Sequence, residues 1–145
     1  MIVHRRPGRL ALVGGIALSL ALAGMAAAWA HAPGLAPVDL EIPIHYSHYG
    51  VSLVTVPVGV PVTIVLRNED PIDHEWIVGD AALHERHRTG TEPVHDSRPT
   101  EVTIPAGTTK ATTVTFNTPG TYLYICHLPG HEAYGMVGTL VVTGN

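Results

Sequence analysis

The chain has 145 residues, one cysteine and a formal net charge of −4 with histidine neutral. All twelve acidic residues lie after residue 30, where only five basic residues accompany them, so that part carries a net charge of −7. An acidic domain of this kind binds nucleic acid poorly, because the phosphate backbone repels it.

The first thirty residues have the composition of a targeting segment. Three arginines come before residue 10, an apolar run follows over residues 10–29, and the run closes in Ala28-Trp29-Ala30. This order predicts an export signal that is cleaved after Ala30. The alternative is a membrane anchor that stays attached, because about 20 apolar residues can span a bilayer. In both cases we expect residues 31–145 to lie outside the cytoplasm, in the periplasm or another extracytoplasmic space.

Residues 31–145 are enough for one domain and too few for two. Their core, about residues 39–143, consists of short alternating runs rich in β-branched residues, with Gly and Pro between the runs. This pattern is typical of an all-β protein built as an antiparallel sandwich or barrel. We expect strands at residues 39–47, 52–57, 62–67, 74–78, 101–105, 109–116, 122–126 and 137–143.

The stretch from residue 79 to residue 100 lacks this alternation and is interpreted as an insertion between strands. It is polar, carries His84, His87 and His95, and allows one helical turn at residues 81–88. On such a turn His84 and His87 would share a face, so the three histidines could bind a second Cu or Zn ion. The alternative is a solvated loop without a metal.

The only cysteine lies in Tyr124-Ile-Cys-His-Leu-Pro-Gly-His-Glu-Ala-Tyr-Gly-Met136. A free thiol that is exposed outside the cell would oxidise, so a metal ligand is the favoured role for Cys126. Pro-Gly in the middle of this stretch predicts a tight turn. One loop therefore brings together the Cys126 thiolate, the His131 imidazole and the Met136 thioether, which are most of a mononuclear copper site.

The remaining ligand is predicted to be His74. In a strand that starts there, His74, Trp76 and Val78 share one face, which the Trp marks as the face toward the core. The alternative is a core histidine bonded to a backbone carbonyl. His127 follows Cys126 directly, and we interpret it as a residue beside the site or at the surface.

Residues 39–143 resemble the cupredoxins. The matching stretches are Asn68-Glu-Asp-Pro-Ile-Asp-His74-Glu and the ligand loop, in which Cys-x-x-Pro-Gly-His is similar to azurin and rusticyanin. Glu75 stands where many members of the family carry Asn. The resemblance implies a Greek-key β-sandwich with a type 1 copper near one end and electron transfer between Cu(I) and Cu(II). It also implies that electrons pass through the exposed edge of His131.

These observations predict an exported, monomeric electron carrier with one type 1 copper and a redox partner protein that has a basic docking patch. Contact with the membrane is expected only through an uncleaved residue 1–30 segment. The main alternative is a copper-resistance protein that sequesters copper, with the histidine-containing insertion as acceptor. We do not expect an enzyme, because a single domain of this size lacks ligands for a second catalytic centre.

Overall fold

The structure is a computed structural model, and it describes residues 38–91 and 98–144. The predicted signal or anchor at residues 1–30 and His95 of the insertion lie outside the described residues. Within the described ranges there are nine strands and one helix, and that helix is too short and too polar to cross a membrane.

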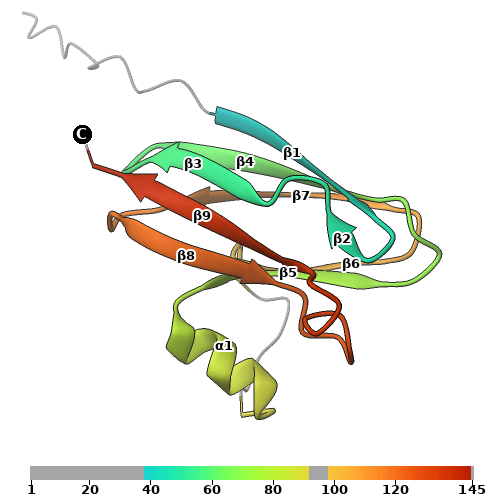
Figure 1. Cartoon of the computed structure of the whole chain (residues 1–145). Coiled ribbons are helices and arrows are strands. Elements are labelled where there is room, and N and C mark those ends of the chain that lie inside the picture. The colour runs from blue at the N-terminus through green and yellow to red at the C-terminus, as the bar shows by residue number, and fades with distance from the viewer. Residues whose placement is uncertain (1–37, 92–97, 145) are drawn as a thin grey trace, which may run out of the picture. The chain divides into compact units, whose positions relative to one another are not determined.

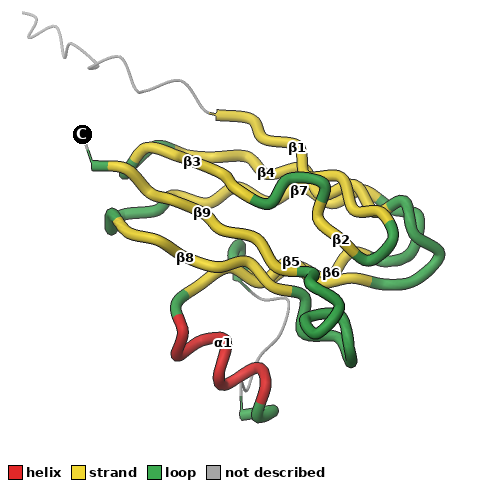
Figure 2. The backbone as a smooth tube through the Cα atoms, in the orientation of Figure 1, coloured by secondary structure: helices red, strands yellow, loops and turns green. Residues whose placement is uncertain are grey.

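The nine strands form two sheets that lie face to face, as Figures 1 and 2 show. The first sheet has the order β2-β1-β4-β7, with the bounds β1 Val38–His45, β2 His48–Tyr49, β4 Pro61–Asn68 and β7 Thr109–Thr115. The second sheet has the order β3-β9-β8-β5-β6, with the bounds β3 Leu53–Pro57, β5 His74–Gly79, β6 Glu101–Ile104, β8 Gly120–Ile125 and β9 Val137–Thr143.

The predicted all-β Greek-key sandwich is confirmed, and each of the eight predicted strands is present within two residues of its expected ends. The short strand β2 was not predicted. Among the described residues, five of the seven strand pairs are antiparallel as predicted, whereas β1 pairs parallel with β4 and β3 pairs parallel with β9. Between β1 and β4 the chain visits the other sheet as β3, and it returns running in the same direction as β1.

The core lies between the sheets and follows the strand alternation. In β4 the side chains of Val62, Ile64 and Leu66 are fully buried, and the opposite sheet contributes Leu140 and Tyr124. Burial of each large aliphatic side chain contributes about 1.5–3 kcal/mol relative to exposure. Alternation along each strand therefore decides which face becomes the core.

One glycine of β9 allows a close approach inside this core. A Cβ atom on Gly138 would lie 2.0 Å from Cζ of Tyr124, far inside van der Waals contact. The Tyr124 ring thus covers the backbone of the neighbouring strand, next to the strand ends that carry the ligand loop. Only glycine fits at this position.

Helix α1 (Ala81–Arg88) covers part of the outer face of the second sheet, next to β5 (Figure 1). Asp80 begins it, since the carboxylate accepts a hydrogen bond of 2.8 Å from the Leu83 N–H. Under the helix, Ile77 and Ile125 are buried to 2% and 1% exposure although they point away from the main core. The predicted helical turn at residues 81–88 is confirmed, so this part of the insertion is not a solvated loop.

Candidate metal centre

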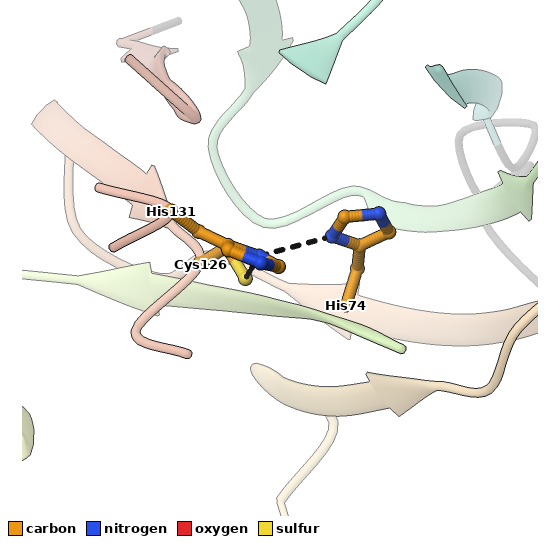
Figure 3. Close-up of side chains that lie close together, drawn as sticks. All are labelled: His74, Cys126 and His131. Carbon is orange, nitrogen blue, oxygen red and sulfur yellow. Dashed lines mark hydrogen bonds between the residues drawn. The ribbon is translucent and has the colours of Figure 1, made fainter. Parts of the chain in front are cut away.

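The antiparallel pairing of β5 with β8 brings His74 and Cys126 to the same end of the second sheet. His74 is the first residue of β5, and Cys126 directly follows the last residue of β8. His131 comes from the loop that continues from Cys126 toward β9. Nδ1 of His131 lies 3.2 Å from Nδ1 of His74 and 3.2 Å from Sγ of Cys126. Figure 3 shows these three side chains close together.

The ligand loop is closed by its own backbone. The Cys126 N–H donates to the Met136 carbonyl at 3.2 Å, and the Met136 N–H donates to the His131 carbonyl at 3.0 Å. Within the loop, the His131 N–H donates to the Leu128 carbonyl at 3.0 Å, and Gly130 takes a φ of 85°. A positive φ is readily adopted only by glycine, so the predicted Pro-Gly turn is what folds His131 back over Cys126.

The three donor atoms fit a first-row transition metal ion. They all lie within 4.8 Å of one another. Nitrogen and sulfur ligands bind such ions at about 2.0–2.3 Å, which places ligands of one ion about 3–4 Å apart. His74 and Cys126 are fully buried, and His131 is half-buried. A thiolate with two imidazoles is a donor set that suits copper.

Asp70 orients His74, and sequence reasoning missed it. Its carboxylate lies 2.9 Å from Nε2 of His74 and accepts the backbone N–H groups of Tyr46 and Ser47, each at 2.7 Å. Burial opposes ionisation of Asp70, but these N–H groups and His74 outweigh it and lower the pKa of Asp70. Because the carboxylate accepts the proton on Nε2, the lone pair of Nδ1 remains available for a metal.

Burial also controls the protonation of the other two donors. It raises the pKa of the Cys126 thiol to about 11, so a metal must displace the proton of this thiol. The backbone N–H of Glu75 donates to Sγ at 3.3 Å and partly offsets that rise. This contact uses the backbone and does not depend on the side chain at position 75. Burial, together with nearby His74, lowers the pKa of His131 and favours the neutral ring that binds metals.

Met136 is fully buried among the core residues beside the loop. Its backbone ties the loop closed, as described above. Its role as the fourth ligand, through the thioether, stays a prediction from the sequence spacing.

Two of the three histidines of the insertion, His84 and His87, lie on α1 and both contact the ring of His127. His84 on α1 contacts His127, with its Nδ1 2.9 Å from Nε2 of that ring. His87 places its Nδ1 3.0 Å from the Leu83 carbonyl oxygen, and its ring stacks on His127. Since His95 lies outside the described residues, a Cu or Zn site made of His84, His87 and His95 stays a prediction.

His127 is not a surface residue. Its side chain is 6% exposed, and burial, reinforced by His84, lowers its pKa to about 4. Across residues 38–91 and 98–144, the His74, Cys126 and His131 cluster is the only group of three or more His, Cys, Asp or Glu donors close enough to share one ion.

A family model described as copper binding proteins of the plastocyanin/azurin family matches residues 38–143. The chain belongs to this family. The cupredoxin resemblance of the sequence is therefore confirmed, and copper is the cofactor that the family binds.

Individual relatives agree with this assignment. The copper-resistant cuproprotein CopI of Pseudomonas aeruginosa is 26% identical over 136 residues, which cover 72% of this chain and 75% of CopI. The structure of auracyanin B matches with a TM-score of 0.62 and 26% identity over 75% of this chain and 91% of auracyanin B. Auracyanin A, a blue copper protein of Chloroflexus aurantiacus, matches with a TM-score of 0.59 and 27% identity over 74% of this chain and all of auracyanin A.

Proposed function

We propose that this cupredoxin is an exported protein that holds one type 1 copper ion and transfers single electrons. The observation that carries the proposal is the convergence of Cys126 Sγ with Nδ1 of His74 and of His131. With a weak axial thioether from Met136, these donors are the ligand set of blue copper sites. Copper bound there would supply a one-electron couple between Cu(I) and Cu(II).

The protein supports electron transfer by holding its donors in fixed positions. Asp70 fixes the ring of His74, the Glu75 N–H fixes the sulfur of Cys126, and backbone bonds close the loop that carries His131. Donors that are positioned by surrounding hydrogen bonds move little when the charge of the site changes. Because the donors move little, the metal site reorganises little when an electron is gained or lost.

The surface around His131 suits contact with a partner protein. His131 is more exposed than the other two donors, and it borders a pocket of about 540 Å³ that Ile72, Leu128 and Pro129 also line. Ile72 is a large apolar residue with 46% exposure. We propose that the partner docks there over the ring edge, and that a basic patch on the partner is drawn by the acidic domain.

Three further points belong to this proposal and follow from the sequence. The residue 1–30 segment directs export and is either cleaved or kept as an anchor. The protein works as a monomer. It is an electron carrier and not an enzyme, because one domain of this size supplies ligands for one redox site and lacks ligands for a second, catalytic centre.

Spectroscopy and kinetics of the copper-loaded protein test this function. We expect strong visible absorption from thiolate-to-Cu(II) charge transfer and the EPR spectrum of a type 1 site. Stopped-flow mixing with a basic one-electron protein, such as a reduced cytochrome c, should show rapid oxidation of that protein that slows as salt is added. A copper-loaded protein without the visible band would contradict the type 1 site. A normal visible band without electron exchange would be consistent with the type 1 site but would refute the carrier role.

Copper sequestration is the second candidate, and the similarity to CopI, which is named a copper-resistant cuproprotein, favours it. The two functions differ in stoichiometry and exchange. One tightly held copper that cycles reversibly supports the carrier, whereas two or more copper ions that exchange readily with a chelator support sequestration.

A further inference from the structure

A second pair of metal-binding side chains lies outside the copper cluster, between helix α1 and the ligand loop. Nδ1 of His84 is 2.9 Å from Nε2 of His127. His84 is 1% exposed, and the side chain of His127 is 6% exposed. The pair joins residues that are 43 positions apart in the chain, so the fold alone brings them together.

The protonation of His84 follows from its other contact. Nε2 of His84 lies 3.2 Å from the carbonyl oxygen of Leu123, and a carbonyl oxygen can only accept a hydrogen bond. Nε2 therefore carries the proton of the neutral ring. Nδ1 then carries a lone pair, and that lone pair faces His127.

His127 consequently meets an acceptor on each side. Its Nε2 faces the lone pair of His84, and its Nδ1 lies 3.5 Å from a carboxylate oxygen of Glu132. A neutral imidazole has one N–H group and can satisfy only one of these acceptors. Without a metal, the Nε2–H of His127 can donate to Nδ1 of His84 at 2.9 Å, because the 3.5 Å contact with Glu132 is longer than an ordinary hydrogen bond.

A metal cation can take the place of this shared proton, because it accepts the lone pairs of both nitrogens. Two imidazole nitrogens that each bind one ion at about 2.0–2.1 Å with an angle near 90° are about 3 Å apart, as His84 and His127 are. The Nδ1–H of His127 can then point at Glu132, the usual support of a metal-bound histidine. Arg88 holds Glu132 in place through hydrogen bonds of 2.6–3.1 Å.

A stacked ring and a neighbouring pocket surround His127. His87 stacks on His127 with ring centres 5.2 Å apart and planes 19° apart. A pocket of about 410 Å³ is lined by His127, Glu132 and Arg88, and it gives space for water ligands next to His127.

From these contacts we propose that His84 and His127 form a second site, which binds a divalent transition metal ion such as Zn²⁺ or Cu²⁺. Two imidazoles are the protein ligands, and water completes the coordination. Because this second site has fewer protein donors than the copper cluster, we expect it to bind its metal ion more weakly. The site differs from the one predicted from the sequence, since His127 takes the place of His87 and His95 as the partner of His84.

Calorimetric titration of the copper-loaded protein with Zn²⁺ tests the site. Wild-type protein should bind one Zn²⁺ without loss of its visible band. His84→Gln and His127→Gln should each weaken this binding at least tenfold and keep the visible band. The control is His45→Gln, which removes a half-exposed imidazole on β1 and should bind Zn²⁺ as the wild type does. Wild-type protein that binds no Zn²⁺, or His84→Gln that binds it as tightly as the wild type, would overturn the proposal.

A measurement without mutations guards against variants that fail to fold. In the diamagnetic Cu(I) form, ring-proton NMR signals of His84 and His127 should shift together as Zn²⁺ is added. Shifts confined to other histidines would refute the site even where both variants are unstable.

Discussion

The copper cluster and the His84–His127 pair lie on opposite faces of the same strand end. Cys126 points into the core toward His74, and the next residue, His127, points out toward α1. Alternation along a strand separates these neighbours. One dipeptide thus serves two sites, with a buried sulfur on one side and a buried imidazole on the other.

The two sites differ in how their donors are supported. The copper cluster is held by Asp70, whose side chain is 6% exposed and which accepts hydrogen bonds from three residues. The pair at α1 is held by Glu132, whose side chain is 32% exposed, with Arg88 40% exposed beside it. Buried support is costly to remove, whereas support at the surface is weakened by solvent.

The largest effect is expected from Cys126→Ser. The hydroxyl cannot replace the thiolate as a soft ligand, so the visible charge-transfer band of the copper form should disappear and copper should bind far more weakly. Absorption spectra at equal copper load measure this. His84→Gln is the matched variant on the other face and should keep the full band. If both variants lost the band, the two sites would not be separate.

Asp70→Ala should destabilise the copper-free protein by about 3 kcal/mol, because it leaves one buried and two part-buried N–H donors without their acceptor. It should also weaken copper binding, since the ring of His74 loses its orientation. Urea unfolding and copper titration measure the two effects. Unchanged stability would show that Asp70 does not hold this end of the sheet.

High pH should destabilise the copper-free protein through Cys126. Burial raises the pKa of this thiol from 9.0 to about 11, so the unfolded chain loses the proton before the folded protein does. The free energy of unfolding that depends on the protonated thiol is fully present below pH 9.0, falls as the pH rises, and is lost above a pH of about 11. It amounts to about 2–3 kcal/mol.

Unfolding curves at a series of pH values measure this loss, and Cys126→Ser is the control. The variant should lack the part of the decline that begins near pH 9.0. Burial raises the pKa of Tyr124 to about 12, so a later decline should remain in both proteins. Identical curves for the two proteins would contradict the assignment to the thiol.

The smallest effect is expected from Arg88→Gln. Hydrogen bonds from Arg88 lower the pKa of Glu132, but both side chains are partly exposed, so the loss of stability should stay below about 1 kcal/mol. NMR titration should show a higher pKa for Glu132 in the variant. A loss of stability as large as that of Asp70→Ala would mean that the His84–His127 pair is held as firmly as the copper cluster.

Much of this fold could be predicted from the sequence, because short-range patterns decide it. Alternation in residues 62–67 identified β4, and the parity of His74 with Trp76 placed that histidine toward the core. Three of the four predicted copper ligands lie within eleven residues of one loop, so their proximity needed only the turn at Pro129-Gly130.

The rest depended on contacts between distant segments. The parallel pairing of β1 with β4 follows from the strand order of the first sheet, and the contact of His84 with His127 follows from the packing of α1 against the second sheet. Alternation encodes neither. Asp70 left a weak signal, since it lies four residues before His74 within a turn that contains Pro71. Nothing in its spacing showed that the turn would fold its carboxylate back onto that ring.

The position of helix α1 next to β5 should slow the local unfolding of that part of the second sheet. β5 and the last residues of β8 are shielded on both faces, with Ile77 and Ile125 buried on the side of α1 and Trp76 and Tyr124 buried on the other side. On β4 of the first sheet, the outward side chains Thr63, Val65 and Arg67 are partly exposed or exposed. Backbone amides of β5 and of the last residues of β8 should therefore exchange with deuterium last, so His74 lies in the segment that stays closed longest.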